Sequence, residues 1–163
     1  MLLKETALVV GLGDMKIAKF PQNITTMGLG SCVGITMYDP HTKLGGLLHA
    51  MMPYIDELNN KSNKYMFVDE GIKEMLKVMI SQGAKKSVIE IKVVGGAEMF
   101  SFTKDAFERI GPRNQESAFK TIMELGYNVK AYDCGKNYGR TITLDTKNGD
   151  LIVKSVGKNN KLI

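Results

Sequence analysis

The 163-residue sequence contains no tryptophan, and it has only two cysteines, two histidines and four prolines. No CxxC spacing occurs, so the cysteines do not form the ligand pattern of a zinc site. The two cysteines, Cys32 and Cys134, lie far apart in the chain, and in a reducing compartment such a pair is expected to remain as two free thiols. The sequence therefore predicts neither a metal site nor a disulfide framework.

Long hydrophobic runs are missing as well. The first apolar piece, residues 7–10, is broken by glycines and then by charged residues, which makes it too short for a membrane helix or a signal-peptide core. We therefore expect a cytoplasmic protein without direct membrane insertion. Internal repeats, low-complexity tracts and Pro/Ser-rich linkers are also absent, so we expect one domain over residues 1–163.

The charge pattern excludes one class of partner. The 22 Lys and Arg against 17 Asp and Glu give a net charge of +5, which favours an acidic partner through long-range attraction. The lysines are nevertheless scattered, and no basic stripe interleaved with aromatic residues is present. We therefore expect no nucleic-acid binding.

A β-hairpin is predicted over residues 31–51. Apolar runs at residues 31–38 and 44–51 flank Asp39-Pro40-His41-Thr42, a sequence typical of a turn. Antiparallel strands pair opposite ends of such a segment. The start of the first strand, which carries Cys32, should therefore lie beside the end of the second strand, which carries His49.

The rest of the chain predicts a mixture of helices and strands. Apolar residues recur at three- and four-residue steps over residues 63–82, which indicates a helix ending before Gly83. A second helix should begin at Asn114 as its N-cap and end at Gly126. Strands are expected over residues 7–12, 87–94, 129–133, 140–145 and 151–156. The sequence thus predicts an α/β protein rich in antiparallel strands.

Residues 25–32 (TTMGLGSC) form a glycine-rich segment that ends in a cysteine. A cysteine is mostly thiol at neutral pH and needs a base to become a nucleophile, which His49 could supply. Gly28 and Gly30 keep bulk away from the thiol, and backbone N–H groups near Ser31 and Cys32 could stabilise an oxyanion.

A third group usually orients such a histidine. The hydroxyl of Thr26 is a candidate, and that of Thr25 could do the same. A cysteine within an apolar strand is, however, more often a buried core residue than a nucleophile, and His49 could likewise be a hydrogen-bonded core residue. Spacing alone leaves both readings open.

Longer motifs resemble a known family. The strings TMGLGSCVG at residues 26–34 and GGLLHAMMP at residues 45–53 resemble the signature of the CheD family of chemoreceptor glutamine deamidases. The similarity continues with Tyr65, KVVGGAEMF at residues 92–100, IGPRN at residues 110–114 and DCGKNYGR at residues 133–140, in the order and spacing of the family. It therefore extends over nearly the whole chain.

The resemblance implies a cysteine nucleophile at Cys32, a general base and acid at His49, and an orienting residue at Thr26. It implies conversion of glutamines on the cytoplasmic helices of methyl-accepting chemotaxis receptors to glutamates, and in some members hydrolysis of glutamyl methyl esters. It also implies binding to a CheC-type phosphatase. The implied reaction needs no cofactor. The implied fold is of the α+β type, with a mixed, largely antiparallel, β-sandwich-like sheet core flanked by helices, as in bacterial toxin deamidase domains.

Further residues are candidates for a substrate cleft. Besides Gly28, Gly30 and Ser31, these are Gly95 and Gly96 at a strand end and Arg113 and Asn114 at a predicted helix start, although a turn and a helix cap explain the last four almost as well. Cys134 stands where the family commonly has threonine, and we expect it to be passive.

Two other functions are compatible with the sequence. One is a regulatory protein that acts mainly by binding a CheC-type phosphatase or receptors, although such a protein would be free to lose Cys32, His49 or Thr26. The other is a cysteine peptidase or thioesterase.

Overall fold

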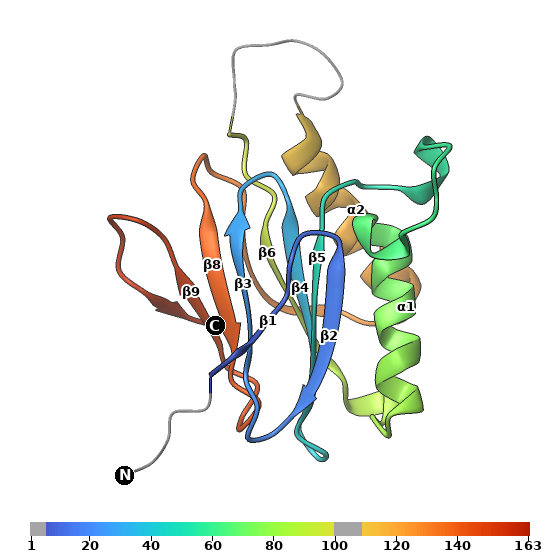
Figure 1. Cartoon of the computed structure of the whole chain (residues 1–163), viewed down its shortest axis with the longest axis vertical. Helices are drawn as coiled ribbons and strands as arrows, with labels where there is room; N and C mark the ends of the chain where they lie inside the picture. The colour runs from blue at the N-terminus through green and yellow to red at the C-terminus, as the bar shows by residue number, and fades with distance from the viewer. Residues whose placement is uncertain (1–5, 100–108) are drawn as a thin grey trace.

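The computed structural model describes residues 6–99 and 109–163, and its strands form two five-stranded sheets (Figure 1). The first sheet has the order β1-β3-β8-β9-β10 and the second has the order β2-β5-β4-β6-β7. The strands of the first sheet are β1 (Leu8–Val9), β3 (Ile24–Leu29), β8 (Arg140–Leu144), β9 (Leu151–Lys154) and β10 (Lys161–Leu162). Those of the second are β2 (Asp14–Lys19), β4 (Val33–Asp39), β5 (Leu44–Ala50), β6 (Glu90–Gly95) and β7 (Val129–Cys134).

Most neighbouring strands are antiparallel. The exceptions are β1 with β3 and β6 with β7, which pair in parallel. The helices α1 (Val68–Ser81) and α2 (Ile110–Glu124) cover the second sheet, and three short 3₁₀ turns, η1 (Ile55–Glu57), η2 (Lys64–Met66) and η3 (Lys86–Val88), connect the elements. This arrangement confirms the predicted fold class, a mixed and largely antiparallel sheet core flanked by helices.

The second sheet is the middle layer of the molecule, and its central strands β4, β5 and β6 are buried on both faces. Leu48 of β5 belongs to the core shared with the helices, whereas the preceding residue, Leu47, belongs to the core between the two sheets. Successive side chains of a strand point to opposite faces, and β2, β5 and β6 accordingly contribute to both cores. Every residue of β4 and of β5 is accordingly buried.

The predicted hairpin is confirmed. Strands β4 and β5 pair antiparallel with Val33 opposite Ala50 and Asp39 opposite Leu44. The predicted strands near residues 87–94, 129–133, 140–145 and 151–156 are present as β6, β7, β8 and β9. The strand predicted over residues 7–12 is only two residues long, and β2 and β3, which follow it, were not predicted.

Helix α1 agrees with its prediction apart from its first turn. Asn63 accepts a hydrogen bond from the Tyr65 backbone N–H and begins the 3₁₀ turn η2 instead of an α-helical turn. The helix ends at Ser81, and Gly83 follows with a φ of 103°. Its six buried residues lie at the predicted helical spacing: Val68, Gly71, Ile72, Met75, Leu76 and Met79.

Helix α2 corrects the predicted N-cap. The helix begins at Ile110, so Asn114 lies inside it and is fully buried. Pro112 does not prevent the earlier start, because the first backbone N–H groups of a helix have no partner within the helix. Of the helices in the two described stretches, neither is long and apolar enough to cross a membrane.

Candidate active site

His49 lies between the two sheets. It sits on β5 directly opposite Gly34 of β4, and only 4% of its surface is exposed. Gly34 allows the sheets to approach closely here, since a Cβ at this position would lie 2.7 Å from Ile142 Cδ1 and 2.9 Å from Leu29 Cδ1 of the first sheet. The imidazole is therefore enclosed by the sandwich itself.

A hydrogen-bond chain from the first sheet fixes the imidazole. The Thr26 hydroxyl donates to the Val10 carbonyl oxygen at 2.7 Å and lies 2.8 Å from His49 Nδ1. A carbonyl can only accept, so the single hydroxyl hydrogen is directed to Val10 and Nδ1–H donates to the Thr26 oxygen. His49 Nε2 is then the nitrogen with the free lone pair, and it has no hydrogen-bond partner among the described residues.

The neighbouring threonine is directed elsewhere. The Thr25 hydroxyl donates to the Ile142 carbonyl at 2.8 Å and lies 3.0 Å from the Thr143 hydroxyl on β8. Consecutive side chains of a strand point to opposite faces. Of the two threonines considered from the sequence, Thr26 is thus the one that contacts His49.

Cys32 lies in the short connection between β3 and β4, two residues before Gly34. Residues two apart on a strand share a face, so Cys32 is placed on the same side of the second sheet as His49. The cysteine packs against the core between the sheets and is partly exposed. The structure thereby brings together the regions of Thr26, Cys32 and His49.

Hydrogen bonds to three successive carbonyls fix the backbone around Cys32. The Ala97 N–H donates to the Gly30 oxygen and the Gly96 N–H donates to the Cys32 oxygen, both at 2.9 Å. Between them, the Ser31 oxygen accepts from Asn114 Nδ2 at 2.9 Å. The N–H groups of Ser31 and Cys32 donate to no described carbonyl outside the strand ladders, so they remain as candidate oxyanion donors.

Burial keeps both catalytic candidates neutral. It raises the pKa of the Cys32 thiol above its usual 9.0, and a hydrogen bond from the cysteine's own backbone N–H opposes this shift only partly. Burial also lowers the pKa of His49 below its usual 6.5. The resting pair is thus a thiol and an imidazole, in which Nε2 is able to accept the thiol proton.

Asn114 joins the cysteine segment to the end of the histidine strand. Its Nδ2 group donates to the carbonyl of Ser31 and also to that of Met51, each at 2.9 Å. Met51 follows the last residue of β5, and Asn114 has no exposed surface. The side chain proposed from the sequence as a cleft residue therefore acts inside the protein, where it positions the segments that carry Cys32 and His49.

Gly95 and Gly96 lie directly behind Cys32. Gly95 has a φ of 110°, and a Cβ there would lie 2.3 Å from the Cys32 oxygen. Gly96 has a φ of 65°, and its carbonyl accepts from the Gln115 side chain at 2.7 Å. Both positions require glycine because of the backbone conformation and, at Gly95, because of the close approach of the cysteine segment.

The other sequence candidates have separate places. Gly28 has a φ of 72° at an irregularity in the pairing of β3 with β8, and a Cβ there would meet no other atom within 4 Å. Arg113 forms an ion pair with Glu57 of η1. The sequence did not predict that the Val10 carbonyl accepts from Thr26, because every residue offers a carbonyl. It also did not predict that Asn114 links Ser31 to Met51, because no local pattern marks a buried amide.

Cys134 differs from Cys32 in its surroundings. It lies at the end of β7, where its thiol is 3.5 Å from the Val93 carbonyl, and burial raises its pKa to about 12. Neither histidine is among its hydrogen-bond partners. In the described ranges, no group of three or more His, Cys, Asp or Glu side chains is arranged to hold a metal ion.

Fold and site together define a β-sandwich protein in which a threonine and a histidine are hydrogen-bonded between the two sheets and a cysteine packs against the core between them. The model of the family "CheD chemotactic sensory transduction" matches residues 51–155. The chain belongs to the CheD family.

Relatives match nearly the full chain. A Methanosarcina acetivorans protein named "Probable chemoreceptor glutamine deamidase CheD 1" is 46% identical and covers 96% of both chains. Proteins named "Probable chemoreceptor glutamine deamidase CheD" from Lachnoclostridium phytofermentans and Caldanaerobacter subterraneus are 42% and 41% identical, covering 94% and 99% of this chain and 96% and 100% of their own. The crystal structure of Bacillus licheniformis hypothetical protein YfiH shares the fold, with a TM-score of 0.50, 14% identity, and coverage of 82% of this chain and 60% of that one.

Replacing Thr26 should change the tautomer of His49. Thr26→Val removes the acceptor for Nδ1–H, so we expect a loss of the Nδ1–H tautomer and a destabilisation of about 1–3 kcal/mol from the unpaired groups. The imidazole nitrogen shifts in NMR spectra report the tautomer, and urea unfolding reports the stability. Thr25→Val is the matched control and should leave the imidazole shifts unchanged; equal changes in both variants would contradict the assignment.

Removing the Asn114 amide should loosen the cysteine segment. In Asn114→Ala, we expect the Gly96 and Ala97 amides to exchange with solvent about tenfold faster or more, because about 1–3 kcal/mol of local restraint is lost. Ser117→Ala is a control on the same helix, since it removes one buried bond to the Pro53 carbonyl and leaves Ser31 bound. Hydrogen exchange measured by NMR separates the two, and similar exchange in both variants would refute the role of Asn114.

Proposed function

We propose that the chain is a protein-glutamine deamidase that converts glutamines of chemotaxis receptors to glutamates. Two observations support this. Relatives named "Probable chemoreceptor glutamine deamidase CheD" match it at 41–46% identity over nearly the whole chain. The site also contains the groups that amide hydrolysis through a covalent intermediate requires, namely a thiol, a base with a free lone pair, and two backbone N–H groups that donate to no described carbonyl outside the strand ladders.

The first half of the reaction forms a thioester. His49 Nε2 accepts the thiol proton as Cys32 Sγ bonds to the side-chain amide carbon of the glutamine, and negative charge moves to the amide oxygen. The Ser31 and Cys32 N–H groups would stabilise this oxyanion. The imidazolium, held through Nδ1–H by Thr26, then protonates the nitrogen, the C–N bond breaks and ammonia leaves.

The second half hydrolyses the thioester. His49, neutral again, accepts a proton from water as the water oxygen bonds to the acyl carbon. The C–S bond breaks, the thiol regains its proton from the imidazolium, and the product is glutamate. Each turnover consumes one water and one amide and needs no cofactor.

The observation that carries the proposal is the direction of the hydrogen bonds at Thr26. Because the Val10 carbonyl takes the hydroxyl hydrogen, the oxygen accepts from His49 Nδ1 and leaves Nε2 as the base. A core histidine with both nitrogens bonded would have no such free nitrogen. His49 Nε2 is buried and without a partner among the described residues, as a base awaiting a proton would be.

The proposal includes substrates and a partner. The substrates are glutamines on the cytoplasmic helices of methyl-accepting chemotaxis receptors, which would place the enzyme in the cytoplasm. Glutamyl methyl esters would react at the same site, because their carbonyl carbon is attacked in the same way and methanol leaves in place of ammonia. A CheC-type phosphatase is the proposed regulatory partner.

The nucleophile can be tested by mass spectrometry. Incubation of the full chain with a receptor cytoplasmic fragment should produce the mass gain that accompanies exchange of an amide NH₂ for OH at specific glutamines. Cys32→Ala should abolish this gain, and Cys134→Ala should retain it, since only Cys32 lies on the face of His49.

The same experiment separates the alternatives. Absence of the gain with the wild-type protein, or equal behaviour of the two cysteine variants, would overturn the mechanism and leave a regulatory binding protein. Cleavage of the fragment backbone would identify a peptidase.

The pH dependence follows from the lowered pKa of His49. The imidazole must be neutral to accept the thiol proton, and its folded-state pKa lies below 6.5. We therefore expect kcat/KM for deamidation to be retained at pH 6.5 and to fall only below it. Because the unfolded chain takes up the proton at higher pH than the folded one, stability should also decline as the pH falls from 6.5 through the folded-state pKa.

Rate measurements at constant ionic strength, together with urea unfolding at each pH, check this dependence. An acidic limb centred above pH 6.5 would mean that the folded-state pKa of His49 is raised instead of lowered, and it would contradict the buried, neutral imidazole.

A further inference from the structure

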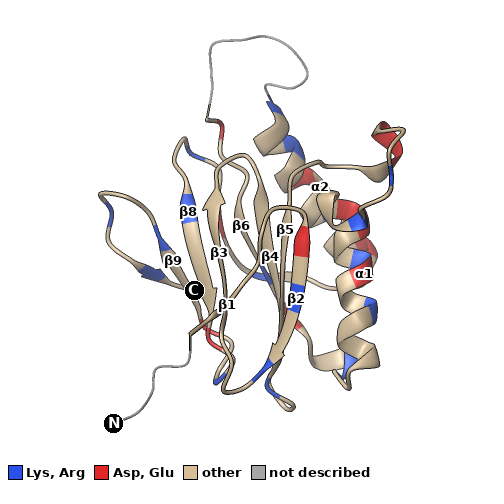
Figure 2. Cartoon of the chain, viewed as in Figure 1, with Lys and Arg blue, Asp and Glu red and all other residues tan. Residues whose placement is uncertain are grey.

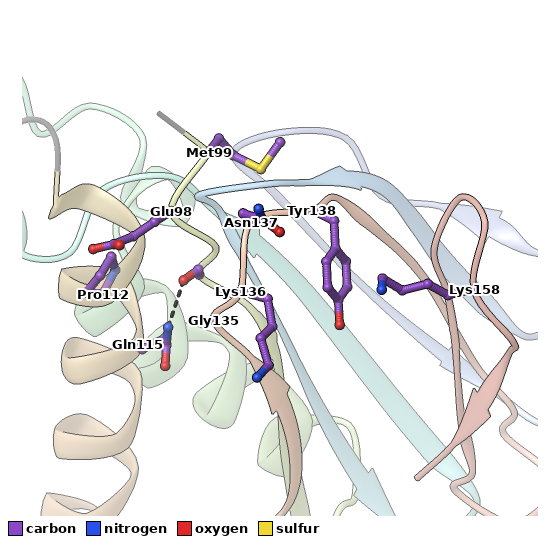
Figure 3. Close-up of a pocket in the computed structure, with 10 residues that line it drawn as sticks. Glu98, Met99, Pro112, Gln115, Gly135, Lys136, Asn137, Tyr138 and Lys158 are labelled. Atoms are coloured by element: carbon purple, nitrogen blue, oxygen red, sulfur yellow. Dashed lines mark hydrogen bonds between the residues drawn. The ribbon is translucent and has the colours of Figure 1, made fainter. Parts of the chain in front are cut away.

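A cleft of about 990 Å³ opens beside the cysteine segment (Figure 3). Its walls come from the chain after β6, from the first turns of α2, from the segment after β7 and from the turn after β9. Gly96, whose N–H donates to the Cys32 oxygen, is part of one wall. Met99, another wall residue, lies against Gly30, where an added Cβ would be 3.1 Å from Met99 Cγ. The cleft therefore shares its wall with the backbone that carries Cys32.

Two exposed lysines give the cleft a positive side. Lys136 and Lys158 line it, and neither is within 4.0 Å of a carboxylate among the described residues. Glu98 is the acidic residue of the lining, and its carboxylate lies beside Pro112 on the wall away from Lys158 (Figure 3). Residues 151–163 add further lysines and no acid, whereas many of the acidic residues lie on α1 and near η1 (Figure 2).

Tyr138 holds the positive side in place. The Lys158 ammonium lies 4.4 Å from the centre of its ring, and the Arg140 guanidinium carbon lies 4.6 Å from it. Arg140 is buried and donates to the Gly135 carbonyl at 2.9 Å, so it anchors the segment that presents Tyr138. A cation over an aromatic face is held with modest strength and stays available to an anion.

The backbone at Lys136 is also fixed. Its φ is 63°, and its carbonyl accepts from the Glu98 N–H at 2.9 Å across the cleft wall. The two ammonium groups thus stand on a defined frame next to the cysteine segment. A protein segment that presents a side chain to Cys32 has this cleft as its neighbour.

We propose that the cleft is a recognition subsite for acidic side chains that flank the target glutamine of a protein substrate. Lys136 and Lys158 would attract carboxylates one helical turn from the glutamine. This inference rests on the proposed deamidation. Nucleic-acid binding in this cleft is disfavoured, because cations cover the ring of Tyr138 and leave no open aromatic face on which a base could stack.

The subsite should act on binding more than on chemistry. The lysines are exposed, and exposed ion pairs contribute modestly and are screened by salt. They do not touch the reacting atoms. Their loss should therefore raise KM and leave kcat unchanged, and the effect should shrink as the salt concentration rises.

A binding experiment tests the subsite without requiring catalysis. The probe is a fluorescein-labelled helical peptide of about 20 residues, with one glutamine and with glutamates three and four positions to either side of it. The comparison peptide has alanine in place of these glutamates. At low salt, we expect Lys136→Gln combined with Lys158→Gln to weaken binding of the acidic peptide about threefold to tenfold, with no change for the alanine peptide.

Lys73→Gln, an exposed lysine on α1, is the matched control and should bind both peptides as the wild type does. The proposal is overturned if the wild type does not bind the acidic peptide, or binds both peptides equally. It is also overturned if the double variant binds the acidic peptide normally, or if a single-stranded oligonucleotide of equal charge binds through the same lysines as tightly.

Deamidation kinetics on a receptor fragment separate this inference from the proposed function. A double variant with unchanged KM on a fragment that the wild type deamidates would refute the subsite alone. Lysine-dependent peptide binding without deamidation of any fragment would refute the proposed function and leave an acidic-segment binding site.

Discussion

A single hydroxyl hydrogen organises the candidate active site of this CheD-family protein. The Thr26 side chain stands between the Val10 carbonyl, which can only accept, and His49 Nδ1, which must then donate. The three groups come from different parts of the sandwich, because Thr26 lies on β3 of the first sheet and His49 on β5 of the second. The state of the imidazole therefore depends on how the two sheets are stacked, and the glycine at position 34 permits that close stacking.

The thiol is positioned by a different set of contacts. The carbonyls of residues 30 to 32 accept hydrogen bonds from the chain at and after the end of β6 and from α2, so these two elements hold the cysteine segment in place. Helix α2 is itself fixed by Ala118 and Ile122, which pack into the core beneath the second sheet. Packing far from the thiol thus determines where the thiol lies.

The sequence could predict those parts that depend on local periodicity. The hairpin follows from two apolar runs around a turn, and α1 follows from apolar residues at helical spacing. Thr26, Cys32 and His49 were predicted as site residues, and of these the structure shows a hydrogen bond between Thr26 and His49 and places Cys32 against the core between the two sheets. The resemblance implied a sandwich-like core, but which strand belongs to which sheet was not predictable, because it depends on pairings such as Thr26 with Ile142, which no local pattern encodes.

The same limit applies to Asn114. The sequence around Asn114 is compatible with a helix that begins at the asparagine and also with one that begins four residues earlier, at Ile110. Local sequence does not distinguish the two starts. Only the packed structure shows that the amide lies inside, between Ser31 and Met51. Its neighbour Arg113, which appeared equivalent in the sequence, pairs instead with Glu57 at the surface.

The protonated resting thiol has a consequence for the life of the protein in a cell. Oxidants such as peroxide attack the thiolate, and cysteines that are ionised at rest are the ones that pass to sulfenic and then to irreversible sulfinic acids. Burial raises the pKa of both Cys32 and Cys134, so both are poor targets for such damage. If Cys32 is the nucleophile as proposed, it gains its reactivity only when a carbonyl and a base are aligned with it, and its neutral state protects it from oxidation between turnovers.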